Sequence, residues 1–119
     1  MRSLVILMIE SEQPEGLSAR KLVVETEKHN VLTSYNAQNG IRLLKRFPNV
    51  DAVLVHSALL EENPDFLSEV KSHANNVPII LASPLANVHS PKADYVIDSF
   101  RPQDLLKLLN EDFAGEQRN

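Results

Sequence analysis

The sequence contains no cysteine, and this absence excludes several kinds of site at once. Without a thiol the chain has no disulfide framework, no zinc ribbon and no cysteine nucleophile. A chain free of cysteine is also typical of a reducing compartment. We therefore expect a cytoplasmic protein whose chemistry, if it has any, uses hydroxyl, imidazole and carboxylate groups.

Glycine is scarce, and basic clusters are missing. The three glycines are isolated, and no glycine-rich turn follows the first apolar run, so the sequence has no phosphate-binding loop. A net charge of -4 with scattered basic residues gives no electrostatic footprint for nucleic acid. We expect no nucleic-acid partner, and an acidic surface that favours protein partners.

Long hydrophobic runs are also absent. The run over 4–9 is too short for a membrane span, and Glu10-Ser11-Glu12 ends it without the small residues of a signal-peptide cleavage site. We expect no membrane association. The 119 residues are 43% hydrophobic and 24% charged, which suits one globular core. The predicted domain covers 1–114, and 115–119 form a polar C-terminal tail.

Short apolar runs alternate with helical patterns along the chain. The runs cover 4–9, 31–34, 52–55, 77–82 and 95–97, and the helical patterns cover 14–28, 37–47, 63–74 and the residues from Pro102 onward. Continuous apolar runs of this length are typical of strands covered on both faces of a parallel sheet. The alternation predicts an α/β fold, an open parallel sheet with helices on both faces.

In such sheets ligands and chemistry gather at the carboxyl ends of the strands. The candidate residues are therefore those that end or follow the apolar runs: Glu10, Ser11, Ser34, His56, Ser57, Ser83 and Asp98.

Four stretches carry a family resemblance. Residues 5–12, 48–55, 77–83 and 93–97 resemble the first, third, fourth and fifth strands of the receiver domain of two-component response regulators, over about 4–113. The resemblance implies a flavodoxin-like, doubly wound five-stranded sheet in the order 2-1-3-4-5. It also implies phosphoryl transfer from a histidine kinase to an aspartate after the third strand, with magnesium on two acids after the first. In the family a hydroxyl ends the fourth strand and a lysine ends the fifth.

The family's site residues are mostly replaced here. Glu10 and Ser11 fall on the two acid positions, His56 on the acceptor aspartate, Ser83 on the hydroxyl and Asp98 on the lysine. Only the hydroxyl matches. The resemblance therefore implies a pseudo-receiver in the phosphorelay family that lacks the phospho-acceptor, has no catalytic residue and needs no cofactor or metal.

The segment between the fourth and fifth predicted strands is about seven residues shorter than the family usually has. It also contains Pro84 and Pro91. Because proline interrupts helices, we expect the family's fourth helix to be shortened or missing.

Several interpretations of His56 stay open. The first is a partly exposed polar residue that was tolerated once an ancestral site was abandoned. The second is a swapped pair, in which Asp98 favours the protonated imidazole of His56. A metal site from Glu10, His56 and Asp98, a phosphohistidine, and a hydrolase triad with Ser57 or Ser83 are weaker alternatives. The other histidines, at positions 29, 73 and 89, are expected to be solvated.

The favoured function is a non-enzymatic signal-transduction module that binds a protein partner independently of phosphorylation. Candidate contacts are Tyr95, Phe100 and Arg101. Tyr95 matches the family's switch aromatic, and its alternative role is a ring at the edge of the core that packs on Leu105. The alternative functions are a phosphorelay receiver phosphorylated by an irregular route, and a small ligand-binding or enzyme domain on the same fold. A homodimer is left open.

Overall fold

The computed structural model of the protein describes residues 4–11, 25, 29–74, 76–84 and 92–114, with side chains up to Glu111. The helix expected over 14–28 lies outside the described residues, apart from Glu25, which is helical. Five parallel strands form one sheet in the order 2-1-3-4-5, as predicted. They are β1 (Val5–Ile9), β2 (Asn30–Ser34), β3 (Ala52–His56), β4 (Ile79–Ser83) and β5 (Tyr95–Asp98).

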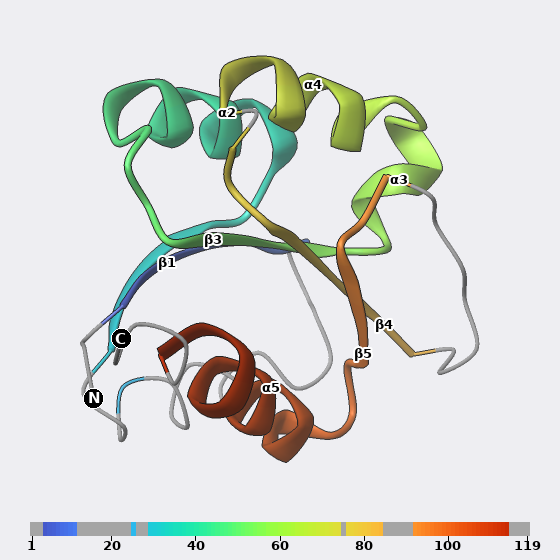
Figure 1. Cartoon of the computed structure of the whole chain (residues 1–119). Helices are drawn as coiled ribbons and strands as arrows, with labels where there is room; N and C mark the ends of the chain where they lie inside the picture. Colours follow the sequence, from blue (N-terminus) through green and yellow to red (C-terminus); the bar gives the residue numbers. More distant parts are fainter. Residues whose placement is uncertain (1–3, 12–24, 26–28, 75, 85–91, 115–119) are drawn as a thin grey trace.

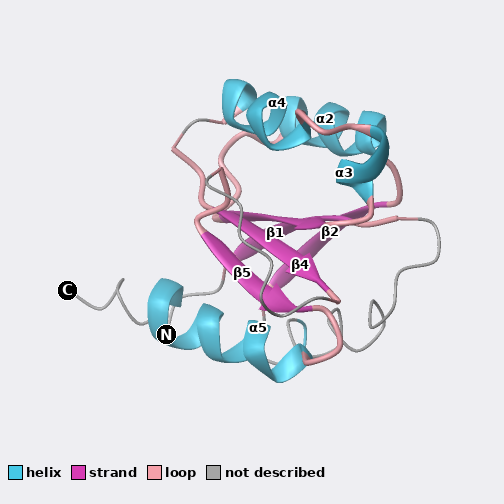
Figure 2. Ribbon diagram, turned by 90° about the vertical axis from the view of Figure 1, so that its right-hand side faces the viewer, coloured by secondary structure: helices cyan, strands magenta, loops and turns pink. Residues whose placement is uncertain are grey.

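Helices cover both faces of the sheet (Figures 1 and 2). On one face lie α2 (Ala37–Arg46), α3 (Leu59–Glu62) and α4 (Phe66–His73). The other face is covered by α5 (Pro102–Leu108), which a π-helical turn, η1 (Leu109–Ala114), continues. No helix in the described part of the chain is long and apolar enough to cross a membrane.

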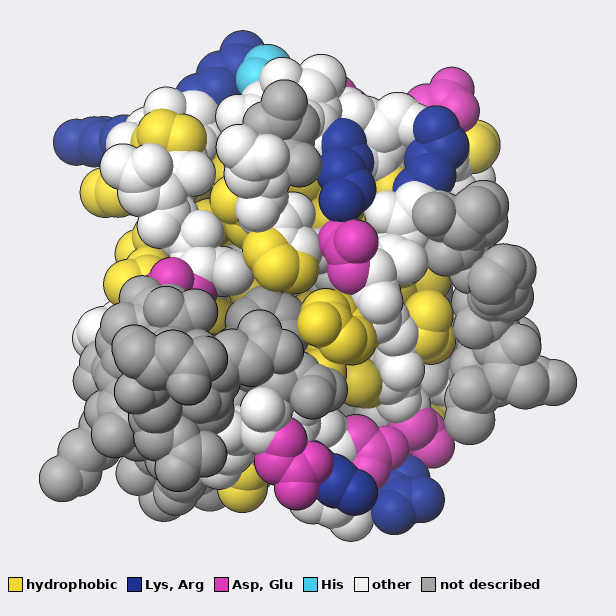
Figure 3. Space-filling view, in the orientation of Figure 1, with side chains coloured by type: hydrophobic (Ala, Val, Ile, Leu, Met, Phe, Trp, Pro, Cys, Tyr) yellow, Lys and Arg dark blue, Asp and Glu magenta, His cyan; other side chains and the backbone are white. Residues whose placement is uncertain are grey.

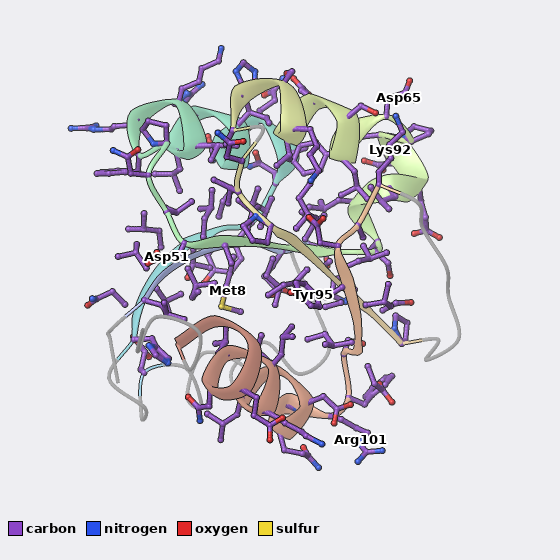
Figure 4. All side chains as sticks on the ribbon, viewed as in Figure 1. Met8, Asp51, Asp65, Lys92, Tyr95 and Arg101 are labelled. Carbon is purple, nitrogen blue, oxygen red and sulfur yellow. The ribbon has the colours of Figure 1, made fainter. Side chains whose placement is uncertain are left out.

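The two core layers follow from the alternation of side chains along the strands. Leu7 and Val53 belong to the cluster between the sheet and the α2–α4 face, whereas Met8 and Leu54 belong to the cluster that includes Leu105 of α5. Figure 4 shows Met8 and Tyr95 in this second layer, between the sheet and α5. Apolar side chains that point both ways explain why the strands were recognisable as continuous apolar runs.

Several element boundaries differ from the sequence-based expectation, and three of the differences have a clear structural cause. β3 includes His56, because the ladder continues through the pair of His56 with Ala82. β4 begins at Ile79 rather than at residue 77, because Pro78 has no N–H to donate to the ladder. The predicted helix start at Asn63 is a turn between two helices, in which the Phe66 N–H donates to the Asn63 carbonyl.

Two side chains bind the backbone at the amino end of β1. Asp51 Oδ2 accepts the N–H of Val5 at 2.8 Å at the start of β1. His29 Nδ1 accepts the N–H of Leu4 at 3.0 Å, and the ring is only 3% exposed. The expectation that His29 is solvated is therefore wrong, because its ring nitrogen serves as an acceptor inside the fold.

The connection between β4 and β5 is described only in part. Pro84 and residues 92–94 are not helical, and 85–91 lie outside the described residues. The expectation that the receiver family's fourth helix is shortened or missing here stays a prediction.

Candidate functional site

The sheet brings the predicted site positions to one edge. Glu10 follows β1, His56 ends β3, Ser83 ends β4 and Asp98 ends β5. Ile9 is paired with Val55, so the register continued by one residue sets Glu10 opposite His56. The carboxyl ends of these parallel strands therefore bring Glu10 and His56 side by side, as the sequence predicted.

These polar side chains are buried. Glu10 is 0% exposed, His56 2% and Ser83 1%. The interpretation of His56 as a partly exposed residue is therefore wrong. The carboxyl ends of β1 and β3 are therefore shielded from solvent. A buried imidazole and a buried carboxyl both need hydrogen-bond partners, so this site is a packed polar interior and not an open cleft.

The hydrogen bond of His56 shows which ring nitrogen lacks a proton. The backbone N–H of Ala58 donates to Nδ1 of His56 at 3.1 Å. A ring nitrogen that accepts an N–H carries no proton itself, so Nδ1 is the acceptor of the ring in this geometry. The His56 side chain thus stabilises the turn that follows it, as an aspartate or asparagine does in an Asx turn.

Asp98 also stabilises the turn that follows it. Its Oδ1 accepts the N–H of Phe100 at 2.9 Å, and its carbonyl accepts the N–H of Arg101 at 3.0 Å. In the sheet, β4 lies between the strands that carry His56 and Asp98. The swapped pair of His56 with Asp98 stays a prediction, which an NMR titration of the His56 ring in the wild type and in Asp98→Asn tests.

The residues at this edge do not fit the magnesium that the resemblance implies. Magnesium prefers near-octahedral oxygen ligands that include one or two accessible carboxylates. Glu10 is the only carboxylate at the two acid positions, and it is fully buried. Within the described ranges no three histidine, aspartate or glutamate side chains form a group that could hold a metal ion. The hypothesis of a metal site from Glu10, His56 and Asp98 is therefore wrong.

The candidate partner contacts lie at the end of β5 and the start of α5. Phe100 is 62% exposed. Arg101 is exposed too, and its Nε lies 3.7 Å from Oδ1 of Asp104. Figure 4 shows Arg101 projecting away from the sheet. Tyr95 is half-buried and packs against the cluster that contains Leu105, and its contact with a partner stays a prediction.

A groove of about 370 Å³ runs beside these residues. One wall consists of the four residues of β5, and the other comes from the residue before α5, from α5 and from η1. The second wall contains Arg101, Asp104, Lys107, Leu108 and Glu111.

The sequence analysis missed one polar residue at this edge. Ser99 is completely buried, and its N–H donates to the carbonyl of Ser83 at 2.8 Å. The predicted fifth strand stopped at Ile97, whereas the pairing with β4 continues to Asp98 and the N–H of Ser99 adds one more hydrogen bond to Ser83. The sequence contained only a weak signal for a longer fifth strand, because Asp98 and Ser99 are residues typical of a turn.

Solved structures of receiver domains share this fold. A response regulator receiver domain protein from Clostridium thermocellum is 22% identical with a TM-score of 0.77, covering 96% of this chain and 97% of its own. The receiver domain of a sensor histidine kinase from Pseudomonas aeruginosa, with a magnesium ion in its active site cleft, is 17% identical with a TM-score of 0.72. That match covers 92% of this chain and 97% of the other. No family model matches the sequence, and no curated protein does.

The chain therefore has the fold of response regulator receiver domains, which was the fold that the sequence predicted. At identities of this size the likeness establishes the fold and leaves function to the residues of the site.

Proposed function

We propose that this chain is a signalling module of the receiver type that binds a protein partner without accepting a phosphoryl group. The observation that carries the proposal is His56. It stands at the position that the family resemblance assigns to the acceptor aspartate, is 2% exposed, and uses Nδ1 to accept the Ala58 N–H. No aspartyl phosphate forms on an imidazole, and a ring buried to this extent offers no accessible nucleophile.

The surroundings of His56 support the same proposal. Transfer of a phosphoryl group needs a cation to offset the charge that develops on its oxygens. Glu10 is the one carboxylate at the acid positions and is fully buried, and Asp98 replaces the cationic lysine. An incoming phosphoryl group would therefore meet two carboxylates and no described lysine or arginine at the matching positions.

Two exposed side chains support partner binding through β5 and α5. Phe100 is the most exposed of the large hydrophobic residues described, at 62%. Arg101 lies next to it with its charged group at the surface. Aromatic residues and arginine are enriched where binding energy concentrates in protein interfaces. We assign the partner contact to Tyr95, Phe100 and Arg101.

The first experiment asks whether the site still responds to a phosphate analogue. Amide NMR spectra are recorded with and without magnesium and beryllium fluoride, which together mimic an aspartyl phosphate. We expect no concerted shifts at Glu10, His56 and Ser83. Saturable shifts of those amides together with Tyr95 would show a working phosphoryl switch and would overturn the proposal.

The second experiment tests the contact residues. A partner is first captured with the wild-type chain. Calorimetry then measures its affinity for the wild type, for Phe100→Ala and for Arg101→Ala. We expect each substitution to weaken binding by at least about tenfold, the scale of an interface hot spot. Phe47→Ala is the matched control, since Phe47 is also exposed, at 42%, but lies at the end of α2. Equal affinity for all three variants would place the interface elsewhere.

A further inference from the structure

The groove beside α5 runs along β5. It contacts all four residues of the strand, including Ile97, which is only 7% exposed. Tyr95 and Ile97 belong to the core layer on the α5 side, so the groove opens beside that face of β5. β5 is the last strand of the sheet, and within the described ranges no strand pairs with its outer side.

The ladder shows which residues of β4 face β5. The carbonyls of Ile79 and Ser83 accept the N–H groups of Asp94 and Ser99, at 2.9 and 2.8 Å. These acceptors are two odd-numbered residues of β4. Because the directions of the backbone N–H and C=O groups alternate along a strand, those of Leu81 point toward β5 as well.

The outward-facing groups of β5 follow from this register. Leu81 is opposite Val96, and in a parallel ladder a residue bonds to the two neighbours of its opposite residue. The N–H and C=O of Val96 therefore point away from β4. The same alternation turns the N–H of Asp98 outward, while the Asp98 carbonyl accepts from Arg101. The edge thus offers two donors and one acceptor to an added strand.

The side chains around this edge add a net negative charge. The lining contains three acidic residues and two basic ones, and one basic residue, Arg101, is held near Asp104. The other charged residues of the lining are Asp98, Glu111 and Lys107. Figure 3 shows acidic and basic side chains together along the lower margin of the molecule, where α5 lies. Leu108 supplies an apolar surface between them.

We propose that an extended segment of the partner protein binds in this groove as a sixth strand, paired with Val96 and Asp98. The proposal rests on the proposed function, because it specifies how the partner is held at that surface. Strand addition takes its affinity from main-chain hydrogen bonds and its specificity from alternate side chains. Here the segment carries a basic side chain for Asp98 and Glu111 and an apolar one for Leu108.

The charge of the chain favours such a segment over a second copy of the protein. The chain has a net charge of -4, and a second copy would bring the same acidic groove against this one. The residues of β5 are Tyr, Val, Ile and Asp, three of which have high strand propensity. The strand contains neither lysine nor proline, the residues by which natural edges avoid pairing.

The probe for this inference is a short peptide of alternating lysine and valine, with both ends blocked. Amide exchange of the full chain is followed by NMR with increasing peptide. We expect the exchange of the Val96 and Asp98 amides to slow by at least about tenfold at saturation, because both become hydrogen-bonded. Sedimentation without peptide is expected to show a monomer, and a dimer that already protects these amides would assign the groove to a second copy.

Two N-methylated peptides distinguish strand pairing from simple charge attraction. One peptide is methylated on the backbone nitrogen of every valine and the other on the backbone nitrogen of every lysine. Each peptide therefore loses the N–H donors along one of its two strand edges. We expect one of them to lose binding and the other to keep it. If both bind as the parent does, the peptide is held by charge alone and the inference is wrong.

Charge variants of the protein complete the test. Glu111→Lys is expected to weaken the peptide by about two- to fivefold, the scale of one exposed ion pair. Glu69→Lys on α4 is the matched control and is expected to leave binding unchanged. If Phe100→Ala loses the partner but the peptide does not protect the Val96 amide, the proposed function stands and only the strand pairing is overturned. If the peptide protects the Val96 amide but neither Phe100→Ala nor Arg101→Ala weakens partner binding, the strand pairing stands and the proposed partner contact is overturned.

Discussion

Lys71 and Asp94 join α4 to the start of β5. The Lys71 Nζ donates to Oδ2 of Asp94 at 3.0 Å, and the same oxygen accepts the N–H of Ile79 at 2.8 Å. Burial alone would raise the pKa of Asp94, but the hydrogen bond from Ile79 and the hydrogen bond and charge of Lys71 outweigh it, and the pKa lies below its ordinary value. The ionised form is therefore the one that stabilises the fold.

The first prediction concerns this contact. Asp94→Ala should lower the free energy of unfolding by about 1–3 kcal/mol at neutral pH, because the N–H of Ile79 loses its acceptor. Asp94→Asn keeps an oxygen for that N–H and loses only a half-exposed ion pair, so we expect a loss of about 0.2–1 kcal/mol. Urea unfolding of both variants measures the difference. An Asn variant as unstable as the Ala variant would contradict the assignment of the Ile79 bond as the larger contribution.

The pH dependence follows from the direction of the shift. A carboxyl whose folded pKa is lowered stabilises the native state above its unfolded pKa, about 4, and this stability is lost as pH falls through the folded pKa. The difference between wild type and Asp94→Asn should therefore be constant from neutral pH to about pH 5 and shrink below about pH 4. A difference that stays constant to lower pH would contradict the lowered pKa.

The second prediction concerns the acceptor role of His56. His56→Ala removes the acceptor of the Ala58 N–H and opens a cavity, so we expect a loss of about 2–4 kcal/mol. His56→Asn can still accept from the residue two positions on, and should cost less than the alanine change by at least about 1 kcal/mol. Chemical unfolding checks both. Equal losses would mean that the ring is held by its packing and not by this hydrogen bond.

The third prediction inverts a common rule. Glycine to alanine in a helix usually stabilises by about 0.5–1 kcal/mol. In Gly40→Ala, however, the new Cβ would lie 2.6–2.9 Å from three carbons of the Ile9 side chain. We expect a loss of about 1–3 kcal/mol from overpacking. Thermal unfolding measures it, with Gln38→Ala on the exposed side of α2 as the control.

A double variant locates the cause of this loss. In the Ile9→Ala background, Gly40→Ala should be nearly neutral or stabilising, because the clashing carbons are gone. An unchanged loss in that background would show that the close approach to Ile9 is not the cause.

The fourth prediction separates two histidines that look alike in the sequence. His29→Ala leaves the Leu4 N–H without an acceptor and removes a buried ring, so we expect a loss of about 2–4 kcal/mol. His73→Ala, at the partly exposed end of α4, should change stability by less than about 0.5 kcal/mol. Losses of similar size in urea unfolding would show that the Leu4 bond contributes little.

The strands and the site edge were predictable, and the reason is physical. The apolar runs that become β1, β3 and β4 are buried on both faces, so the pattern is visible without knowing what covers them. The boundaries were less certain. His56 joins β3 through pairing with Ala82, and that pairing depends on a strand more than twenty residues away, which no local pattern reveals.

The sequence by itself determined the parallel α/β fold and the positions that meet at its carboxyl edge, including a histidine where the resemblance places an aspartate. The fold and the meeting of these positions follow from side-chain types and periodicity along the chain, whereas the aspartate position is what the resemblance implies. Only the tertiary structure decided that His56 and His29 are buried and which backbone N–H groups they accept. It also decided that β5 and α5 line one groove. Burial and backbone pairing arise where distant segments pack together, so they depend on register and layer order that the linear chain does not contain.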